Sequence, residues 1–145
     1  MGKVHSLTHD LAIEMLVRAE KMANEAGKTA ILIFVDYNGK EITKIVMDGA
    51  YGFLANEAML KARQSSRTGK TTKETAEEIS DKKTTPAILG ISQDRLIEIP
   101  GGLPIYDDES NLLGAVGMSC NDNDHFFSEM VLKKVIEESN LMFSK

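Results

Sequence analysis

The feature that most constrains the fold is an apolar stretch that reads Thr-Ala-Ile-Leu-Ile-Phe-Val from Thr29 to Val35. The alternation of polar and apolar residues that marks a half-exposed strand is missing here, so the stretch predicts a central strand buried on both faces. Asp36-Tyr37-Asn38-Gly39 follows and predicts a hairpin turn, with residues 41–47 as the returning strand. Such a strand needs cover on both sides of its sheet.

Helices are expected at both ends of the chain. The first begins at a cap, Ser6 or Thr8, carries apolar residues at steps of three and four, and ends at Gly27. The last begins after a cap at Asn121 or Asp122 and extends to about residue 143.

Two further helices are expected in the middle of the chain, over residues 53–65 and 73–80. The second has the signature of a capping box, in which Thr71 or Thr72 caps the helix and Glu74 bonds back to the cap.

Three more strands are predicted over residues 95–99, 103–107 and 112–119. The order α-ββ-αα-βββ-α, with hairpin connections, predicts an α+β fold with a five-stranded antiparallel sheet in a three-layer α/β/α sandwich. A chain of 145 residues suits one domain, here residues 1–145.

Composition excludes several classes of function. A net charge of −5, with no long basic run, argues against nucleic-acid binding. No apolar run approaches the roughly 20 residues of a membrane span, and the N-terminus lacks the apolar core of a secretory signal, so a cytoplasmic protein without a membrane partner is expected. The single cysteine, Cys120, can form no intramolecular disulfide. No nucleophile elbow or phosphate loop is present, so no catalytic residue is assigned and a non-enzyme is favoured.

A glycine- and proline-rich turn precedes the last predicted strand pair. It reads Pro-Gly-Gly-Leu-Pro from Pro100 to Pro104, and Gly114 and Gly117 follow with two residues between them. Gly101 and Gly102 tolerate positive φ angles, and glycines within a strand mark a close approach by another backbone or by a ligand. Two interpretations are open: a strained turn that leads into a tightly packed strand, or the floor of a binding site.

The histidines are the first candidates for metal binding. His5 and His9 are four residues apart and would share a helix face if the first helix reached residue 5. A closed zinc site needs four ligands, and no further ligands are evident beside this pair. For His125, at the start of the last helix, a structural or solvent-facing role is expected.

The start of the last helix offers two other features. Its free backbone amides could bind an anion, but the aspartates at 122 and 124 favour self-capping. Cys120 lies beside this helix N-terminus, where a thiol pKa can fall; the simpler interpretation is a small buried apolar residue.

Several of these segments, in this order, resemble the GlcG/HbpS family of heme-binding domains, which also form the C-terminal part of PduO-type cobalamin adenosyltransferases. The segments that carry the resemblance are Ser6-Leu7-Thr8, Phe34 to Gly39, Met47 to Ala50, Ala58 to Ala62, and the glycine-rich pair of segments from Pro100 to Ile105 and from Gly114 to Ser119. The family's usual Gly-Gly after the last segment is replaced here by Cys120-Asn121, which changes the backbone available at that loop.

The resemblance implies a profilin-like or Roadblock-like fold and a small-molecule-binding domain that takes heme or a related tetrapyrrole at a subunit interface of a homo-oligomer. His9 is then the axial ligand of the metal, since iron accepts a single imidazole nitrogen. Lys61, Gly101, Gly102 and Gly117 are the other predicted cofactor-binding residues.

Two alternatives belong to other classes of function. The PduO resemblance allows an accessory or regulatory subunit in cobalamin or diol metabolism with a corrinoid as its cofactor, although the adenosyltransferase domain is absent from this sequence. A pure oligomerisation scaffold is the other, because profilin-like domains often act through dimerisation.

Overall fold

A computed structural model describes residues 6–145. Its sheet has four antiparallel strands in the spatial order β2-β1-β4-β3. The strands are β1 (Ala30–Asp36), β2 (Glu41–Val46), β3 (Gly102–Tyr106) and β4 (Leu112–Cys120). The α+β class and the antiparallel sheet are confirmed, but the prediction of five strands is wrong.

The strand that is missing is the one predicted over residues 95–99. A short 3₁₀ helix, η1 (Gln93–Arg95), takes up its beginning. The backbone of Ile97 then pairs with the side-chain amide of Gln64, which accepts a bond from the Ile97 N–H at 2.8 Å and donates one to its carbonyl at 2.7 Å. A helix side chain therefore satisfies both polar groups that a neighbouring strand would have satisfied.

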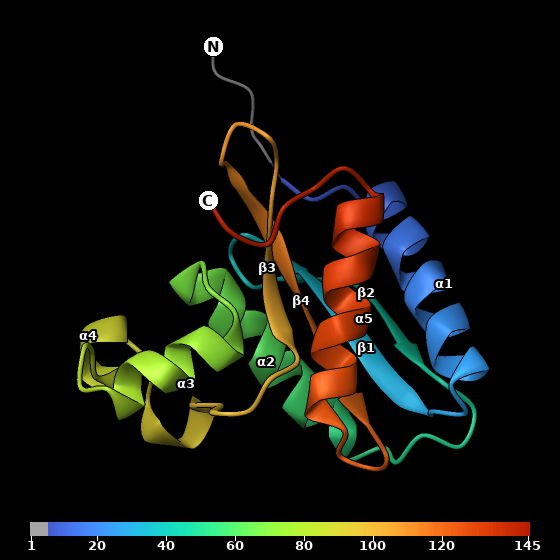
Figure 1. Cartoon of the computed structure of the whole chain (residues 1–145), viewed down its shortest axis with the longest axis horizontal. Helices are drawn as coiled ribbons and strands as arrows, with labels where there is room; N and C mark the ends of the chain where they lie inside the picture. Colours follow the sequence, from blue (N-terminus) through green and yellow to red (C-terminus); the bar gives the residue numbers. More distant parts are fainter. Residues whose placement is uncertain (1–5) are drawn as a thin grey trace.

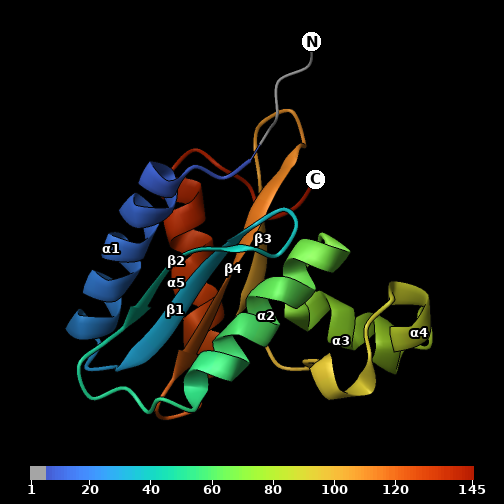
Figure 2. The same ribbon diagram turned by 180° about the vertical axis from the view of Figure 1, so that it is seen from behind.

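Helices cover both faces of the sheet (Figures 1 and 2). The helices α1 (His9–Glu25) and α5 (His125–Glu138) pack on one face, and α2 (Leu54–Thr68) packs on the other. Two shorter helices, α3 (Thr72–Ser80) and α4 (Pro86–Leu89), lie beside α2 and form a lobe at one side of the molecule (Figure 1).

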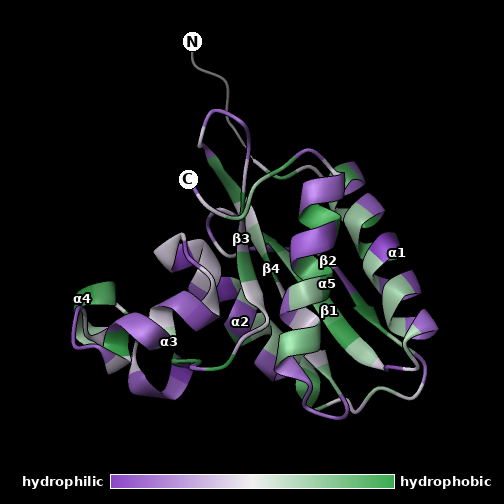
Figure 3. Cartoon of the chain, viewed as in Figure 1, coloured by the Kyte–Doolittle hydropathy of each residue, from purple (hydrophilic) through white to green (hydrophobic). Residues whose placement is uncertain are grey.

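The hydrophobic core divides into two clusters because β1 is buried on both faces, as its sequence predicts. Leu32 and Phe34 face α1 and α5, while Ile31, Ile33 and Val35 face α2. Figure 3 shows the same division, with apolar strands in the middle and hydrophilic residues on the outer sides of the helices. Burial on both faces is what fixes β1 at the centre of the molecule.

The predicted turn and caps are largely confirmed. The Asp36 carboxylate accepts bonds from the N–H groups of Asn38 and Lys40, and Gly39 has a φ of 82°. Thr8 caps α1, and Thr71 and Glu74 form the complete capping box of α3.

The last helix is shorter than predicted. Its cap is Asp124 and not the predicted Asn121 or Asp122. The Asp124 carboxylate accepts from the Phe127 N–H, and the helix ends at Glu138. Asn140 then adopts a left-handed φ of 58°, and Met142 pairs with Tyr106 on the outer edge of β3. The chain leaves the helix early because its last residues cover this exposed strand edge.

Candidate functional site

The predicted cofactor-binding residues separate into two places. Lys61, Gly101, Gly102 and Gly117 lie together and buried where α2 crosses β3 and β4. His9 lies exposed in the first turn of α1, on the other face of the sheet. The sequence alone could not show this separation, because it depends on which face each helix covers.

The glycines of β3 and β4 admit the backbone of α2. A Cβ atom on Gly117 would lie 2.1 Å from the Ala58 carbonyl oxygen, and one on Gly102 would lie 2.5 Å from the Lys61 carbonyl oxygen. Both distances are far below van der Waals contact, so any side chain at either position would push the helix away. The close approach that the glycine spacing predicts is made here by another backbone. The assignment of these glycines to a ligand stays a prediction.

Lys61 occupies the centre of this contact, and its side chain is completely buried. Its ammonium donates to the Met118 carbonyl oxygen at 2.7 Å and lies 3.2 Å from both Glu57 Oε1 and His125 Nδ1. Burial lowers the pKa of Lys61, and the carboxylate of Glu57 opposes that shift. An ammonium has three hydrogens, and these three acceptors match them.

His125 completes a cluster that consists of Glu57, Lys61, Ser119 and His125. Lys61 and Ser119 are buried, and Glu57 and His125 are partly exposed. The Nδ1 atom of His125 lies 3.6 Å from Glu57 Oε1, and the Ser119 hydroxyl donates to the same carboxylate at 3.1 Å. Burial and the adjacent Lys61 ammonium lower the pKa of His125. Because Nδ1 accepts from Lys61, neutral His125 carries its proton on Nε2.

Sequence reasoning did not assemble this cluster. The four-residue spacing of Glu57 and Lys61 on one helix is a visible signal for an ion pair. The contributions of Ser119 and His125 have no such signal, since they come from β4 and α5. In physical terms, the cluster joins α2 to the end of β4 and the start of α5.

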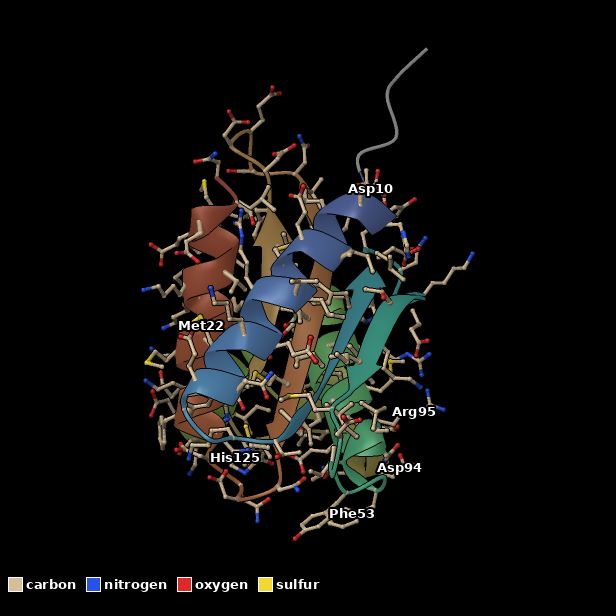
Figure 4. The ribbon with its side chains drawn as sticks, turned by 90° about the vertical axis from the view of Figure 1, so that its right-hand side faces the viewer. Asp10, Met22, Phe53, Asp94, Arg95 and His125 are labelled. Atoms are coloured by element: carbon tan, nitrogen blue, oxygen red, sulfur yellow. The ribbon has the colours of Figure 1, made fainter. Side chains whose placement is uncertain are left out.

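His9 has the opposite environment. It is the first residue of α1, and no hydrogen bond or ion pair involves its ring among residues 6–145. The cap of that helix is Thr8, which accepts from the Leu11 N–H, so the helix start does not depend on His9. Figure 4 shows its neighbour Asp10 at one end of the molecule and His125 at the other. The other member of the predicted histidine pair, His5, lies outside the described residues.

The loop before α5 is used for structure. Asp122 and Asp124 both pair with Lys28, and Asp124 caps the helix, as self-capping predicts. Asn121 accepts from the Tyr51 N–H and donates to the Gly49 carbonyl, which ties this loop to the start of α2. Cys120 is buried beside Ser128, and burial raises the pKa of its thiol. A reactive thiolate is therefore disfavoured.

An open groove on the outer side of α5 has a volume of about 440 Å³. Phe126 and Met130 line it at one helical turn and are 69% and 52% exposed, with Lys133 and Lys134 further along the same helix. Two neighbouring apolar side chains that are each more than half exposed are suited to contact with a ligand or a second protein.

Metal and membrane features are absent from the part of the chain that the structure describes. Residues 6–145 contain no cluster of three or more metal-ligating side chains. None of their helices is both long and apolar enough to cross a membrane.

Comparison with solved structures identifies proteins that share the fold. The ORFY protein of Klebsiella pneumoniae has a TM-score of 0.83 at 22% identity over 96% of this chain and 94% of its own. PduOC in its complex with heme has a TM-score of 0.82 at 17% identity, over 97% and 99% of the two chains. A double mutant of Streptomyces reticuli HbpS has a TM-score of 0.79 at 20% identity, over 95% and 90%. At these identities the likeness establishes a shared fold.

The family follows from the sequence comparison. The family model described as "Haem degrading protein HbpS-like" matches residues 7–131. The chain belongs to the HbpS-like family, as the resemblance predicts. No curated protein matches the chain at a significant level. None of these comparisons supports the corrinoid alternative.

Proposed function

We propose that this protein binds heme and that His9 supplies an axial ligand to the iron. The observation that carries the proposal is the family match over residues 7–131 to proteins described by their action on haem. The heme complex of PduOC, which shares the fold, supports the same ligand class. When bound, heme would supply an iron centre that takes one or two axial nitrogens.

The chemistry of the histidines favours His9 over His125 as ligand. The ring of His9 is exposed and has no partner among residues 6–145, so either nitrogen can reach a metal. The Nδ1 lone pair of His125 accepts from Lys61, and its Nε2 carries the proton in the neutral ring. Ligation by His125 would require breaking its bond to the buried Lys61.

We also infer that the heme lies between copies of the chain in a homo-oligomer. The groove on α5 that offers apolar contact is lined by Phe126 and Met130 and does not include His9. Porphyrin affinity depends on apolar contact, and the exposed His9 is flanked in the chain by the exposed polar residues Thr8 and Asp10. A second subunit that placed its α5 groove, with Phe126 and Met130, against His9 would supply the missing apolar wall and would place this small-molecule site at an interface.

The test is a heme titration of the purified protein, followed at the Soret band, with wild type and two matched variants. His9→Ala removes the proposed ligand, and His5→Ala removes the histidine four residues earlier as a control. We expect a saturable band in wild type and His5→Ala, and a shifted or much weaker band in His9→Ala. An unchanged band in His9→Ala would discard that residue as ligand. No band in any of the three would leave the scaffold alternative.

The oligomeric state is tested separately by sedimentation with and without heme. We expect wild type to sediment as an oligomer, and Met130→Asp to shift the distribution toward monomer. A monomeric wild type under both conditions would contradict the interface proposal but not heme binding itself.

The family description adds a second reaction to examine, since it speaks of haem degradation. The heme complex is incubated with ascorbate in air, and the Soret band is followed over time. Loss of the band with release of iron would favour an enzyme. A stable band would favour a binding protein, in line with the absence of an evident catalytic group in the sequence.

A further inference from the structure

A second cleft lies between α2 and the residues that follow α4. It has a volume of about 510 Å³ and is formed by one side of α2 and by residues 90–95. The sequence contains only four arginines, and three of them, Arg63, Arg67 and Arg95, line this cleft. Figure 4 shows Asp94 and Arg95 on the side of the molecule away from α5, so the cleft is separate from the α5 groove.

The three arginines have no acidic partners. Within residues 6–145 none of them forms a salt bridge, whereas lysines elsewhere pair with carboxylates, as Lys28 and Lys70 do. One carboxylate, that of Asp94, is among the residues lining the cleft. Three guanidinium groups against one carboxylate give a local positive charge in a chain whose net charge is −5. A cleft with this charge attracts anions.

Two of the guanidinium groups are held in place through their Nε atoms. Arg63 Nε donates to the Gly39 carbonyl oxygen at 3.1 Å, and Arg67 Nε donates to the Leu89 carbonyl oxygen at 3.1 Å. These bonds orient the side chains and leave the N–H groups of the terminal nitrogens without an acceptor among residues 6–145. A planar guanidinium held in this way can form paired hydrogen bonds to a carboxylate or a phosphate.

The glycine at the end of α4 makes room for this arrangement. Gly90 has a φ of 72°, and a Cβ atom there would lie 2.3 Å from Arg67 Nη2. The guanidinium of Arg67 therefore rests directly against the Gly90 backbone. Leu60 and Ile91 add apolar walls to the same cleft.

We propose that this cleft binds a compact anion that carries two or more carboxylate or phosphate groups. It is a site distinct from the proposed heme site, and its existence does not depend on heme binding. Three arginines along one cleft suit a ligand with several charges better than a single chloride or acetate, because each guanidinium group can pair with a separate anionic group.

The test is isothermal titration of the heme-free protein with pyrophosphate and with citrate at low salt. Arg63→Gln and Arg95→Gln each remove one cleft cation. Arg18→Gln removes the remaining arginine, which lies on α1 outside the cleft, and serves as the matched control. We expect saturable binding in wild type and Arg18→Gln, a loss of about tenfold or more in affinity for each cleft variant, and weaker binding as salt is raised.

The two probes distinguish the ligand chemistries. Tighter binding of pyrophosphate assigns the cleft to phosphates, and tighter binding of citrate assigns it to carboxylates. Thermal unfolding checks that each variant is folded. The Arg95 side chain forms no hydrogen bond or ion pair within residues 6–145, so its variant remains informative if Arg63→Gln is unstable. Absence of binding to either probe, or an equal loss in Arg18→Gln, would overturn the proposal.

Discussion

The two faces of the sheet are packed by different kinds of contact. On the α2 face, glycines let a helix backbone touch the strands, and a buried lysine satisfies its charge with neighbouring acceptors. On the α1 and α5 face, large apolar side chains such as Phe34 and Leu132 fill a conventional core. The first face depends on close backbone contact and charge pairing, and the second on apolar burial.

The difference indicates where ligands can bind. The contact between α2 and the sheet leaves no space for a ligand at Gly102 and Gly117, because the backbone of α2 occupies the places where their side chains would lie. The side chains proposed above as ligand contacts lie on the outer surfaces: the ring of His9, Phe126 and Met130 of α5, and the arginines of the cleft beside α2. We therefore expect changes between α2 and the sheet to affect stability, and changes on the outer surfaces to affect binding.

The largest effect is expected from Gly117→Val. The new side chain would meet the backbone of α2, where the Ala58 carbonyl oxygen lies 2.1 Å from the Cβ position. We expect a loss of more than about 3 kcal/mol in the free energy of unfolding, or no folded protein. Gly52→Ala is the control, since nothing lies within 4 Å of its Cβ position. Urea unfolding measures both, and equal stability of the two variants would contradict the close contact.

The next largest effect is expected from Lys61→Met. This change keeps the approximate volume but leaves the Glu57 carboxylate and the Met118 carbonyl oxygen without their cation. We expect a loss of about 3 kcal/mol in urea unfolding. The double variant Lys61→Met/Glu57→Gln should recover part of that loss, because it removes the uncompensated charge. A double variant less stable than Lys61→Met would show that the pairing contributes little.

A smaller effect is expected from pH. The pKa of His125 lies below its ordinary value of 6.5, so the unfolded state binds a proton at a higher pH than the native state does. The contribution of neutral His125 to the free energy of unfolding is therefore complete above pH 6.5, and the free energy of unfolding falls as pH is lowered from there. Urea unfolding between pH 7.5 and 5 measures the slope. His125→Gln, which retains an acceptor for Lys61, should reduce it, and an unchanged slope would assign it to other groups.

The smallest effect on stability is expected from Phe126→Ser. The ring is 69% exposed on α5, so we expect a change below about 0.5 kcal/mol in the unfolding of the monomer. Leu132→Ala on the same helix removes a fully buried side chain and should cost about 2–5 kcal/mol. Heme affinity and sedimentation are then measured for Phe126→Ser. A large stability loss in Phe126→Ser would show that this exposed ring contributes to the stability of the monomer.

The local structure of this protein could largely be predicted from its sequence. Three features depend only on residues close together in the chain, so their patterns can be recognised in the sequence. They are the burial of β1, the turn at Asp36 to Gly39 and the capping box of α3. The strand predicted over residues 95–99 could not be excluded in this way. Its segment has suitable apolar residues, and only the position of Gln64, some thirty residues earlier, explains why it pairs with a helix side chain.

The candidate sites depended on the tertiary structure to a greater extent. The sequence by itself determined the family, four of the five predicted strands, the approximate positions of the predicted helices, and the residue types that can carry charge or bind a metal. Only the packing decided that α2 fills the space above Gly102 and Gly117, that His9 and Lys61 lie on opposite faces, and that three arginines line one cleft. The physical reason is that these contacts join residues far apart in the chain, and their geometry is set by which helix packs on which face of the sheet.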